Sequence, residues 1–324
     1  MKTIIKLSVI FPLLLIITGC PFDCDCPTPS EPKVSQYDLD KMIVETNTTN
    51  VSTGIESIFT NGISDSITRA HFCQTFVDYA RFYDDGSGYF FIETLNDAWV
   101  VAHINHDLIG TSRIDIQDEN GTYFIQNMVQ TVAYSGYGFI EYYRKNPATE
   151  LIDRKMSFVT SIPSADWFIG TGFYGDPPEQ YYLYNEAYDL IVMESTNTMA
   201  NGFGGILKEI YTNEEEGIQF CRTFVDHIRF FENSSGYFFI TDMDGICIAQ
   251  GSNPELEGQN LYDLQDTQGL YFIREMIDVV SAQGSGFVIY RWNNPATGND
   301  ETKSTYVTKI PGTDYFIGSG YYIY

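Results

Sequence analysis

The stretch "SGYFFI" occurs twice in this chain, at residues 87–92 and, without a change, at residues 235–240. Its aromatic and β-branched residues favour a β-strand. The same offset of 148 positions relates the neighbouring sequence, because residues 136–174 match residues 284–322 at 19 of 39 positions without a gap. Repeats of about 20 to 50 residues indicate a solenoid, whereas a longer period indicates a duplicated domain. The 324-residue sequence therefore predicts two copies of one domain.

A helix is predicted before each "SGYFFI" strand. Its apolar residues recur at i, i+4, i+8 and i+11, which places them on one helix face. These residues are Phe72, Phe76, Ala80 and Tyr83 in the first copy, and Phe220, Phe224, Ile228 and Phe231 in the second. Cys73 and Cys221 occupy equivalent places on this face, so we expect them to be buried small hydrophobes rather than a disulfide.

The sequence after each strand predicts the rest of a sheet. In the second copy, Asp244 and Gly245 mark a hairpin, and residues 271–282 have the spacing of a short amphipathic helix. Three further β runs, "GFVIYRWNN", "TKSTYVTKI" and "YFIGSGYYI", are separated by turns rich in Pro, Asn and Gly. We therefore expect an α/β (α+β) fold in which a long N-terminal helix leads into a mostly antiparallel five-stranded sheet, with helices packed on one face.

A long polar stretch, "GSNPELEGQNLYDLQDTQGL", follows the hairpin at residues 251–270. Loops of this length inside a compact domain are uncommon and typically border a binding site. We therefore expect this loop to cover a ligand pocket.

The composition excludes several classes of function. The chain has 43 acidic against 18 basic residues, a formal charge of −25, which disfavours nucleic acid because phosphate binding relies on Lys and Arg. With four histidines, no G-x-S-x-G stretch and no glycine-rich phosphate loop, the sequence predicts no catalytic residues, no enzymatic activity and no cofactor. "DMDG" at residues 242–245 is like a fragment of a calcium loop but lacks the later ligands, so we predict no metal site.

The N-terminal segment has the layout of a bacterial export signal. Residues 1–19 combine a basic start with a short apolar run, and "ITGC" resembles a lipobox in which Cys20 receives the lipid. The alternative is an ordinary signal peptide with an incidental cysteine. We expect residues 20–36 to form a proline-rich tether, with Cys24 and Cys26 too isolated to indicate a metal site. The predicted location is the cell membrane, lipid-anchored, on the extracytoplasmic side, whether periplasmic or cell-surface.

The order of these motifs resembles the cache domain family, specifically the single-cache type 2 found outside the membrane in prokaryotic chemoreceptors and sensor kinases. In the second copy the resemblance is carried by "SGYFFITDMDGICIAQ", "NPELEGQNLYDLQD", "GSGFVIYRWNNPATG" and "TKSTYVTKIPGTDYFIGSGYY". The first copy keeps "SGYFFI", "VVAH", "NPAT" and "DWFIGTGFY" but diverges at residues 103–121. We assign domain 1 to residues 37–176 and domain 2 to residues 177–324.

The resemblance implies a PAS-like sheet behind a long helix, with a small-molecule pocket between the sheet and the loops above it. Ligands of the family are often small carboxylates, and related domains take amines or amino acids. On the first strand of domain 2, alternation places Tyr237, Phe239 and Thr241 on one face, which we predict to be the pocket floor.

Lys303 is a candidate partner for a ligand carboxylate, the alternative being a lysine that faces solvent. The family pattern also has a lysine before this strand, and Lys155 is its counterpart in domain 1. Strand alternation puts Lys303 on the opposite face from Tyr306, so both can face the pocket only if the strand is bulged. Both residues are kept as candidates.

Further candidates come from residue types suited to acids or amines. Arg229 could bind a carboxylate through two hydrogen bonds or pair with Asp226. Gln250 stands where domain 1 and the family pattern have His103, which predicts different ligand preferences. Asp314 could receive an amine or cap its turn. The remaining domain 1 candidates are Arg81 and Tyr89.

The expected function is small-molecule binding and sensing by a lipid-anchored extracytoplasmic protein, with domain 2 the better candidate for ligand. Because no membrane-spanning, kinase or methyl-accepting segment follows the last strand, we expect the signal to pass to a separate membrane receptor, sensor kinase or transporter. The alternatives are ligand delivery to a transporter, or a surface scaffold or adhesion protein with vestigial pockets.

Overall fold

The computed structural model describes residues 32–323. Lys33–Tyr324 form one compact unit. The predicted signal peptide, the predicted lipidation site Cys20, and Cys24 and Cys26 lie outside the described residues. Within the part that is described, none of the helices has both the length and the apolar character of a membrane span.

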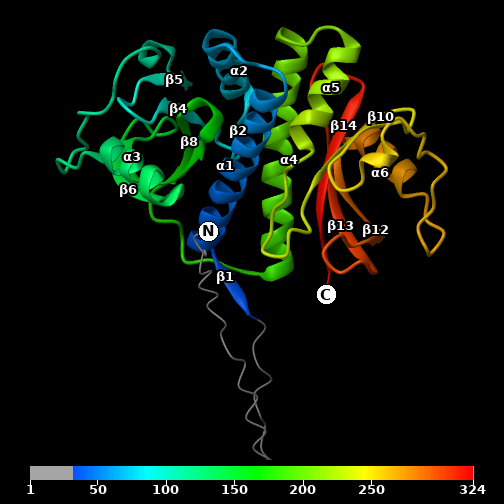
Figure 1. The fold of residues 1–324 in the computed structure, drawn as a ribbon. Helices are drawn as coiled ribbons and strands as arrows, with labels where there is room; N and C mark the ends of the chain where they lie inside the picture. The colour runs from blue at the N-terminus through cyan, green and yellow to red at the C-terminus, as the bar shows by residue number, and fades with distance from the viewer. Residues whose placement is uncertain (1–31, 324) are drawn as a thin grey trace, which may run out of the picture. The chain divides into compact units, whose positions relative to one another are not determined.

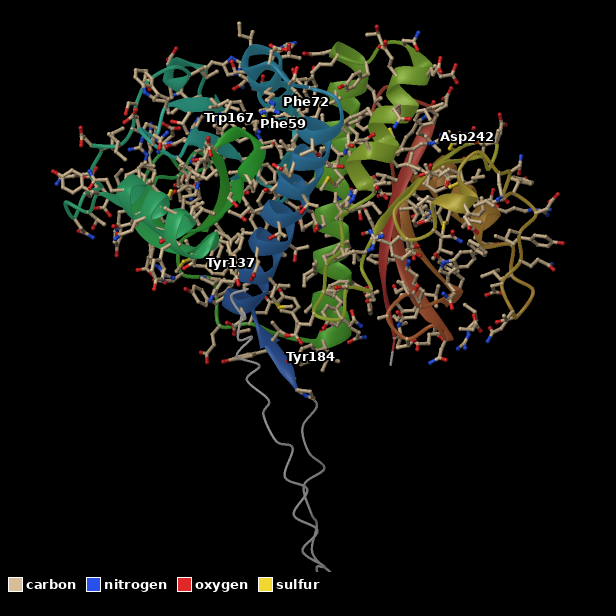
Figure 2. The ribbon with its side chains drawn as sticks, viewed as in Figure 1. Phe59, Phe72, Tyr137, Trp167, Tyr184 and Asp242 are labelled. Atoms are coloured by element: carbon tan, nitrogen blue, oxygen red, sulfur yellow. The ribbon has the colours of Figure 1, made fainter. Side chains whose placement is uncertain are left out.

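Domain 1 begins with two helices, followed by a sheet. Its elements are β1 (Lys33–Ser35), α1 (Gln36–Asn61), α2 (Ser66–Tyr79), β2 (Arg81–Phe82), β3 (Gly88–Tyr89), β4 (Phe91–Thr94), β5 (Val100–His103), η1 (His106–Leu108), α3 (Phe124–Ser135), β6 (Tyr137–Lys145), β7 (Ile152–Ile162), η2 (Pro163–Ala165) and β8 (Trp167–Tyr174). The side chain of Ser35 accepts a hydrogen bond from the Asp38 amide and so caps α1. At the other end of α1, Phe59 packs edge-on against Phe72 of α2 and Trp167 of β8 (Figure 2).

Domain 2 repeats the same order. Its elements are β9 (Tyr181–Leu183), α4 (Tyr184–Glu209), α5 (Glu214–Val225), β10 (Phe238–Asp242), β11 (Cys247–Gln250), η3 (Pro254–Leu256), α6 (Phe272–Gln283), β12 (Ser285–Asn293), β13 (Asp300–Lys309) and β14 (Tyr315–Tyr322). Each domain has a five-stranded sheet, in the order β5-β4-β8-β7-β6 or β11-β10-β14-β13-β12, and every pair is antiparallel. The predicted α/β class and five-stranded antiparallel sheet are confirmed.

The helices differ from the sequence prediction in two respects. The helix before each "SGYFFI" strand is the shorter of a pair: α2 ends at Tyr79, and Tyr83 lies beyond it with φ of 60°. Helices also cover both faces of the sheet rather than one, with α4 on one side and α6 on the other (Figure 1). Strand alternation explains this, because Phe238 and Ile240 pack toward α4 whereas Tyr237 and Phe239 pack toward α6.

The two domains pack against each other through equivalent residues of their helices, and α1 and α4 lie side by side (Figure 1). Phe76 stacks on Phe224 with ring centroids 5.6 Å apart, and each of the two rings also fills the space that a side chain on one glycine would need. Those glycines are Gly54 for Phe224 and Gly202 for Phe76. The two phenylalanines, like the two glycines, are 148 positions apart and are therefore equivalent residues of the two domains. Each ring thus packs over the equivalent glycine of the other domain. Such a reciprocal contact indicates a pseudo-two-fold axis between the domains, as in an isologous dimer.

The cysteines of these helices are buried as predicted. Cys73 and Cys221 are both free thiols with no exposed surface. Burial raises the pKa of both thiols, so they behave as small apolar side chains.

Candidate ligand site

A small cavity in domain 2 lies between the sheet and the segment containing η3 and α6. It measures about 20 Å³, which is room for about one water molecule. Its walls are mostly apolar and aromatic, with a few polar groups, as small-molecule sites require. The lining residues are Tyr237, Phe239, Thr241, Cys247, Gln250, Leu256, Leu261, Phe272, Ile273, Tyr290 and Trp292.

The floor of the cavity comes from the strand that was predicted to form it. Tyr237, Phe239 and Thr241 all line the cavity, which confirms their shared face. Phe239 lies flat across the neighbouring strand because residue 318 is glycine: a Cβ there would be 2.4 Å from the Phe239 ring. Alternation along the strand therefore turns these side chains toward the cavity, and the glycine at position 318 leaves room for the Phe239 ring.

An aromatic wall that the sequence analysis missed closes one side. Phe272 of α6 stacks on Tyr290 of β12 with ring centroids 4.5 Å apart and an interplanar angle of 4°. Trp292 meets the same Phe272 ring edge-on at 5.2 Å. Tyr290 and Trp292 are two residues apart on one strand, so strand alternation could have placed them on one face.

Lys303 is completely buried and is not itself a lining residue, but it contacts Tyr237 in the cavity floor. Its Nζ is 3.8 Å from the ring centroid of Tyr237 and 5.3 Å from that of Tyr322. Within residues 32–323 no group meets the geometric limits for a hydrogen bond to its Nζ and no carboxylate pairs with it; the Tyr237 side chain is the polar group that interacts with its charge. Burial lowers the pKa of Lys303, and the nearby Tyr237 opposes the shift. An ammonium in this position is stabilised by an anion that binds beside it.

The register of β13 decides between Lys303 and Tyr306. Pairing with β14 runs without a shift from Lys303 to Lys309, so the strand is not bulged. Tyr306 therefore faces α4 and packs against Phe287 at 5.0 Å. This corrects the inclusion of Tyr306 in the site.

Both candidate arginines bind backbone oxygens instead of facing the cavity. Arg229 lies beyond the end of α5 and donates to the carbonyls of Asp226, Ile228 and Gly251. Arg81 donates to the carbonyls of Val77 and Ala80. These hydrogen bonds hold each arginine at the end of its helix, and neither arginine lines the cavity.

Of two further candidates, Gln250 lines the cavity and Asp314 does not. Gln250 is buried and lines the cavity, and its Oε1 accepts a hydrogen bond from the Ser252 amide at 3.3 Å. Asp314 lies instead in the turn before β14, where its carbonyl accepts a hydrogen bond from the Met243 amide at 3.1 Å. Only Gln250 is therefore part of the site.

The domain 1 candidates form an equivalent cluster. Lys155 is fully buried, with Nζ 4.0 Å from the Tyr89 ring centroid and 3.2 Å from the hydroxyl of Tyr174. The His103 ring lies 5.6 Å from that of Tyr89, and its Nδ1 accepts a hydrogen bond from the Asn105 amide. Burial and nearby cations, Arg113 first among them, lower the pKa of His103 to about 3, so this ring is neutral.

The carboxylate of Asp266 organises the second half of the polar loop over the domain 2 cavity. Asp266 accepts hydrogen bonds from the amides of Gln268, Leu270 and Arg291, each at 2.9 Å. The last of these ties the loop to β12. Leu256 and Leu261 of the loop line the cavity, which supports its predicted position over the pocket.

Replacing Asp266 by alanine is expected to loosen this loop at a cost of about 1–2 kcal/mol in unfolding free energy, because three amides lose a charged acceptor. Hydrogen exchange of residues 251–270 should become faster while exchange in α4 is unchanged. The matched control is Asp278→Ala on the exposed face of α6. Equal exchange in the two variants would contradict the proposed role of Asp266.

Family models match both halves of the chain. One described as "Single Cache domain 2" matches residues 41–177, and one described as "Cache domain" matches residues 180–324. The chain belongs to the Cache family. It contains two Cache domains in tandem.

Curated relatives of this Cache protein match over a short stretch. Methyl-accepting chemotaxis protein McpP of Pseudomonas putida is 32% identical over 87 residues, which are 27% of this chain and 16% of that protein. Sensor histidine kinase MctS of Rhizobium johnstonii is 34% identical over 88 residues, 27% of this chain and 19% of that protein. The chain thus spans less than a fifth of either relative.

Solved structures with similar sequences are also Cache or sensor domains. A periplasmic sensor domain of a chemotaxis protein is 26% identical, covers 40% of this chain and 90% of its own, and has a TM-score of 0.37. A structure described as "Structural basis for carboxylic acid recognition by a Cache chemosensory domain" is 28% identical, covers 39% of this chain and 87% of its own, and has a TM-score of 0.35.

Proposed function

We propose that domain 2 binds a short monocarboxylate and that the protein acts as an extracytoplasmic small-molecule sensor. The carrying observation is Lys303, a buried lysine that has no carboxylate partner among the described residues and whose Nζ contacts Tyr237 in the floor of an aromatic cavity. A single cation matches a single carboxylate, and the apolar walls match a short hydrocarbon chain. Membership in the Cache family and relatives that are a chemoreceptor and a sensor kinase support the sensing role.

The small cavity limits the ligand to a few heavy atoms. Its 20 Å³ would have to widen even for acetate, and the wall that can yield is the loop carrying Leu256 and Leu261. Larger acids would require displacement of the stacked Phe272 and Tyr290 pair. We therefore expect affinity to fall beyond three or four carbons.

Calorimetric titration with acetate, propionate, butyrate, glycine and ethylamine tests this proposal. The expected result is binding of acetate or propionate, weaker binding of butyrate and none of ethylamine, with the ligand recovered unchanged because we propose no catalysis. A bound acid should also raise the unfolding midpoint with its concentration. Binding of ethylamine in preference to both acids, or of no acid at all, would contradict the proposal and favour a scaffold.

The lipid anchor and the route of signalling belong to the same proposal. The lipobox-like "ITGC" ending at Cys20 supports attachment to the membrane through a lipid. Transfer of the signal to a separate membrane protein, or of the ligand to a transporter, is consistent with that attachment.

A further inference from the structure

A groove between the two domains has far more room than the cavity of domain 2. It measures about 690 Å³, which is within the usual range for ligand sites. One wall is a face of α1 and the other is the first part of α4, and the segment from Arg229 to Glu232 also lines it. None of its lining residues belongs to the cavity of domain 2, so this interdomain groove is separate from the predicted ligand pocket.

The interdomain groove has the length of a short extended peptide. Its α1 residues recur at i, i+4, i+7, i+8, i+11 and i+12 from Asp38 to Asn50, which is one face of the helix. At 1.5 Å per residue this face is about 18 Å long. An extended chain advances about 3.3–3.6 Å per residue, so about five residues would span it.

The pseudo-two-fold symmetry of the domains breaks at this groove. At the pseudo-symmetric position, Glu194 of α4 accepts a hydrogen bond from the amide of Tyr83 at 3.1 Å, which ties that helix to the segment after α2. The equivalent residues in the groove are Thr46 and Phe231. Threonine carries no carboxylate that could make this contact, so the two sides of the groove are not tied in this way.

Asn50 supplies a hydrogen-bond donor without an acceptor. It lines the groove and is 1% exposed, and its Nδ2 has no hydrogen-bond partner among the described residues. Its equivalent in domain 2, Thr198, does have one, since it accepts a hydrogen bond from Asn47 Nδ2 at 3.4 Å. A buried donor without an acceptor is costly, so a ligand oxygen that accepts from Asn50 is favoured.

The charges of the groove suit a cation. Its lining includes three carboxylates, Asp38, Glu45 and Glu232, against the two cations Lys33 and Arg229. Arg229 is already engaged, because it donates to backbone carbonyls. A cation that enters the groove therefore meets an excess of negative charge.

Aromatic rings favour a cation further. The ring of Tyr188 lies 6.2 Å from that of Tyr184 and 4.9 Å from that of Phe231, which gives a continuous aromatic wall. The faces of such rings attract cations. Burial also raises the pKa of Glu45, with Lys41 opposing, so a bound cation would stabilise the ionised carboxylate.

We propose that the interdomain groove binds a short basic peptide, a free oligopeptide of about five residues in an extended conformation. Its ammonium groups meet the carboxylates and the aromatic wall, and one of its carbonyls accepts a hydrogen bond from Asn50. A peptide fits better than a simple polyamine, because a polyamine has no acceptor for this amide. The proposal goes beyond the function proposed for domain 2 and does not rest on it.

Calorimetric titration of the full chain with a blocked pentapeptide of alternating lysine and alanine tests this assignment. The comparison ligands are spermidine, which also carries three positive charges but has no acceptor, and the glutamate counterpart of the peptide. The lysine peptide should bind and the glutamate peptide should not. Spermidine should bind roughly threefold to tenfold more weakly than the lysine peptide, because it lacks one hydrogen bond.

Two single variants separate the groove from the general attraction of a chain with a formal charge of −25. Asn50→Leu should weaken the lysine peptide by roughly threefold to tenfold without lowering the urea midpoint, because it removes an unpaired polar group. Glu45→Gln should weaken it roughly twofold to fivefold. The matched control, Glu275→Gln at an exposed position of α6, should leave its affinity unchanged.

A double variant that copies the tied position should abolish binding. Thr46→Glu/Phe231→Tyr introduces the equivalents of Glu194 and Tyr83, and the loss would occur despite an added negative charge. Its urea midpoint is measured first, and Asn50→Leu decides if it does not fold. Absence of peptide binding, equal affinities for the lysine peptide and spermidine, or equal effects of Glu45→Gln and its control would each overturn the proposal. Failure of acetate to bind would contradict only the function proposed for domain 2.

Discussion

Lys303→Met is expected to weaken acetate binding by domain 2 roughly 10- to 100-fold, because a hydrogen bond to a buried charge is worth about 1.5–3 kcal/mol. Methionine keeps most of the volume of the lysine stem, so the floor formed by Tyr237 stays packed. The matched control is Lys309→Met, at the exposed end of the same strand. Calorimetric titration of both variants checks this, and equal affinities would remove Lys303 from the site.

The acetate affinity and the stability of the natural chain are both expected to depend on pH through Lys303. Burial holds the pKa of Lys303 below its ordinary value of 10.5, so acetate affinity should fall on the alkaline side before pH 10.5 is reached. Between the folded-state pKa and 10.5 the unfolded chain binds more protons at this residue, so this term makes the natural chain more stable as pH rises. Lys303→Met should remove the contribution of this residue to the pH dependence of acetate affinity and of the free energy of unfolding. Urea unfolding and titration across this range measure them.

Phe224→Ala is expected to lower the free energy of unfolding by about 3–5 kcal/mol, since it opens a cavity in the interface between the domains. The ring stacks on Phe76, lies 5.0 Å from Phe203, and fills the space above Gly54. The control is Phe287→Ala on β12, which is 39% exposed and should cost about 1 kcal/mol or less.

The pseudo-symmetry adds a second measurement to this prediction. Phe76→Ala should cost about as much as Phe224→Ala, because each ring packs over the equivalent glycine of the other domain. The double variant should cost less than the sum, since the two rings share one contact. Urea unfolding measures all three, and additive losses would mean that the two rings act independently.

The sequence predicted which way the side chains of a strand face, but not which groups the charged side chains bind. Period-two alternation correctly separated Tyr237 and Phe239 from Phe238 and Ile240, because a strand allows two side-chain directions. The same rule stated that Lys303 and Tyr306 face opposite ways, and the unbulged register bears it out. The partners of the arginines were not foreseen, because Arg81 and Arg229 bind backbone carbonyls, which the sequence does not display as partners.

The sequence by itself determined the duplication, the order of the strands along the chain and the opposite facing of Lys303 and Tyr306, since repeats and alternation are local properties of the chain. Only the tertiary structure decided that Lys303 is buried and has no carboxylate partner within residues 32–323, because its surroundings come from other strands of the sheet. It also decided that Arg113 pairs with Glu93, 20 positions earlier, inside domain 1. The physical reason is that buried charges find their partners through folding and not through their spacing along the chain.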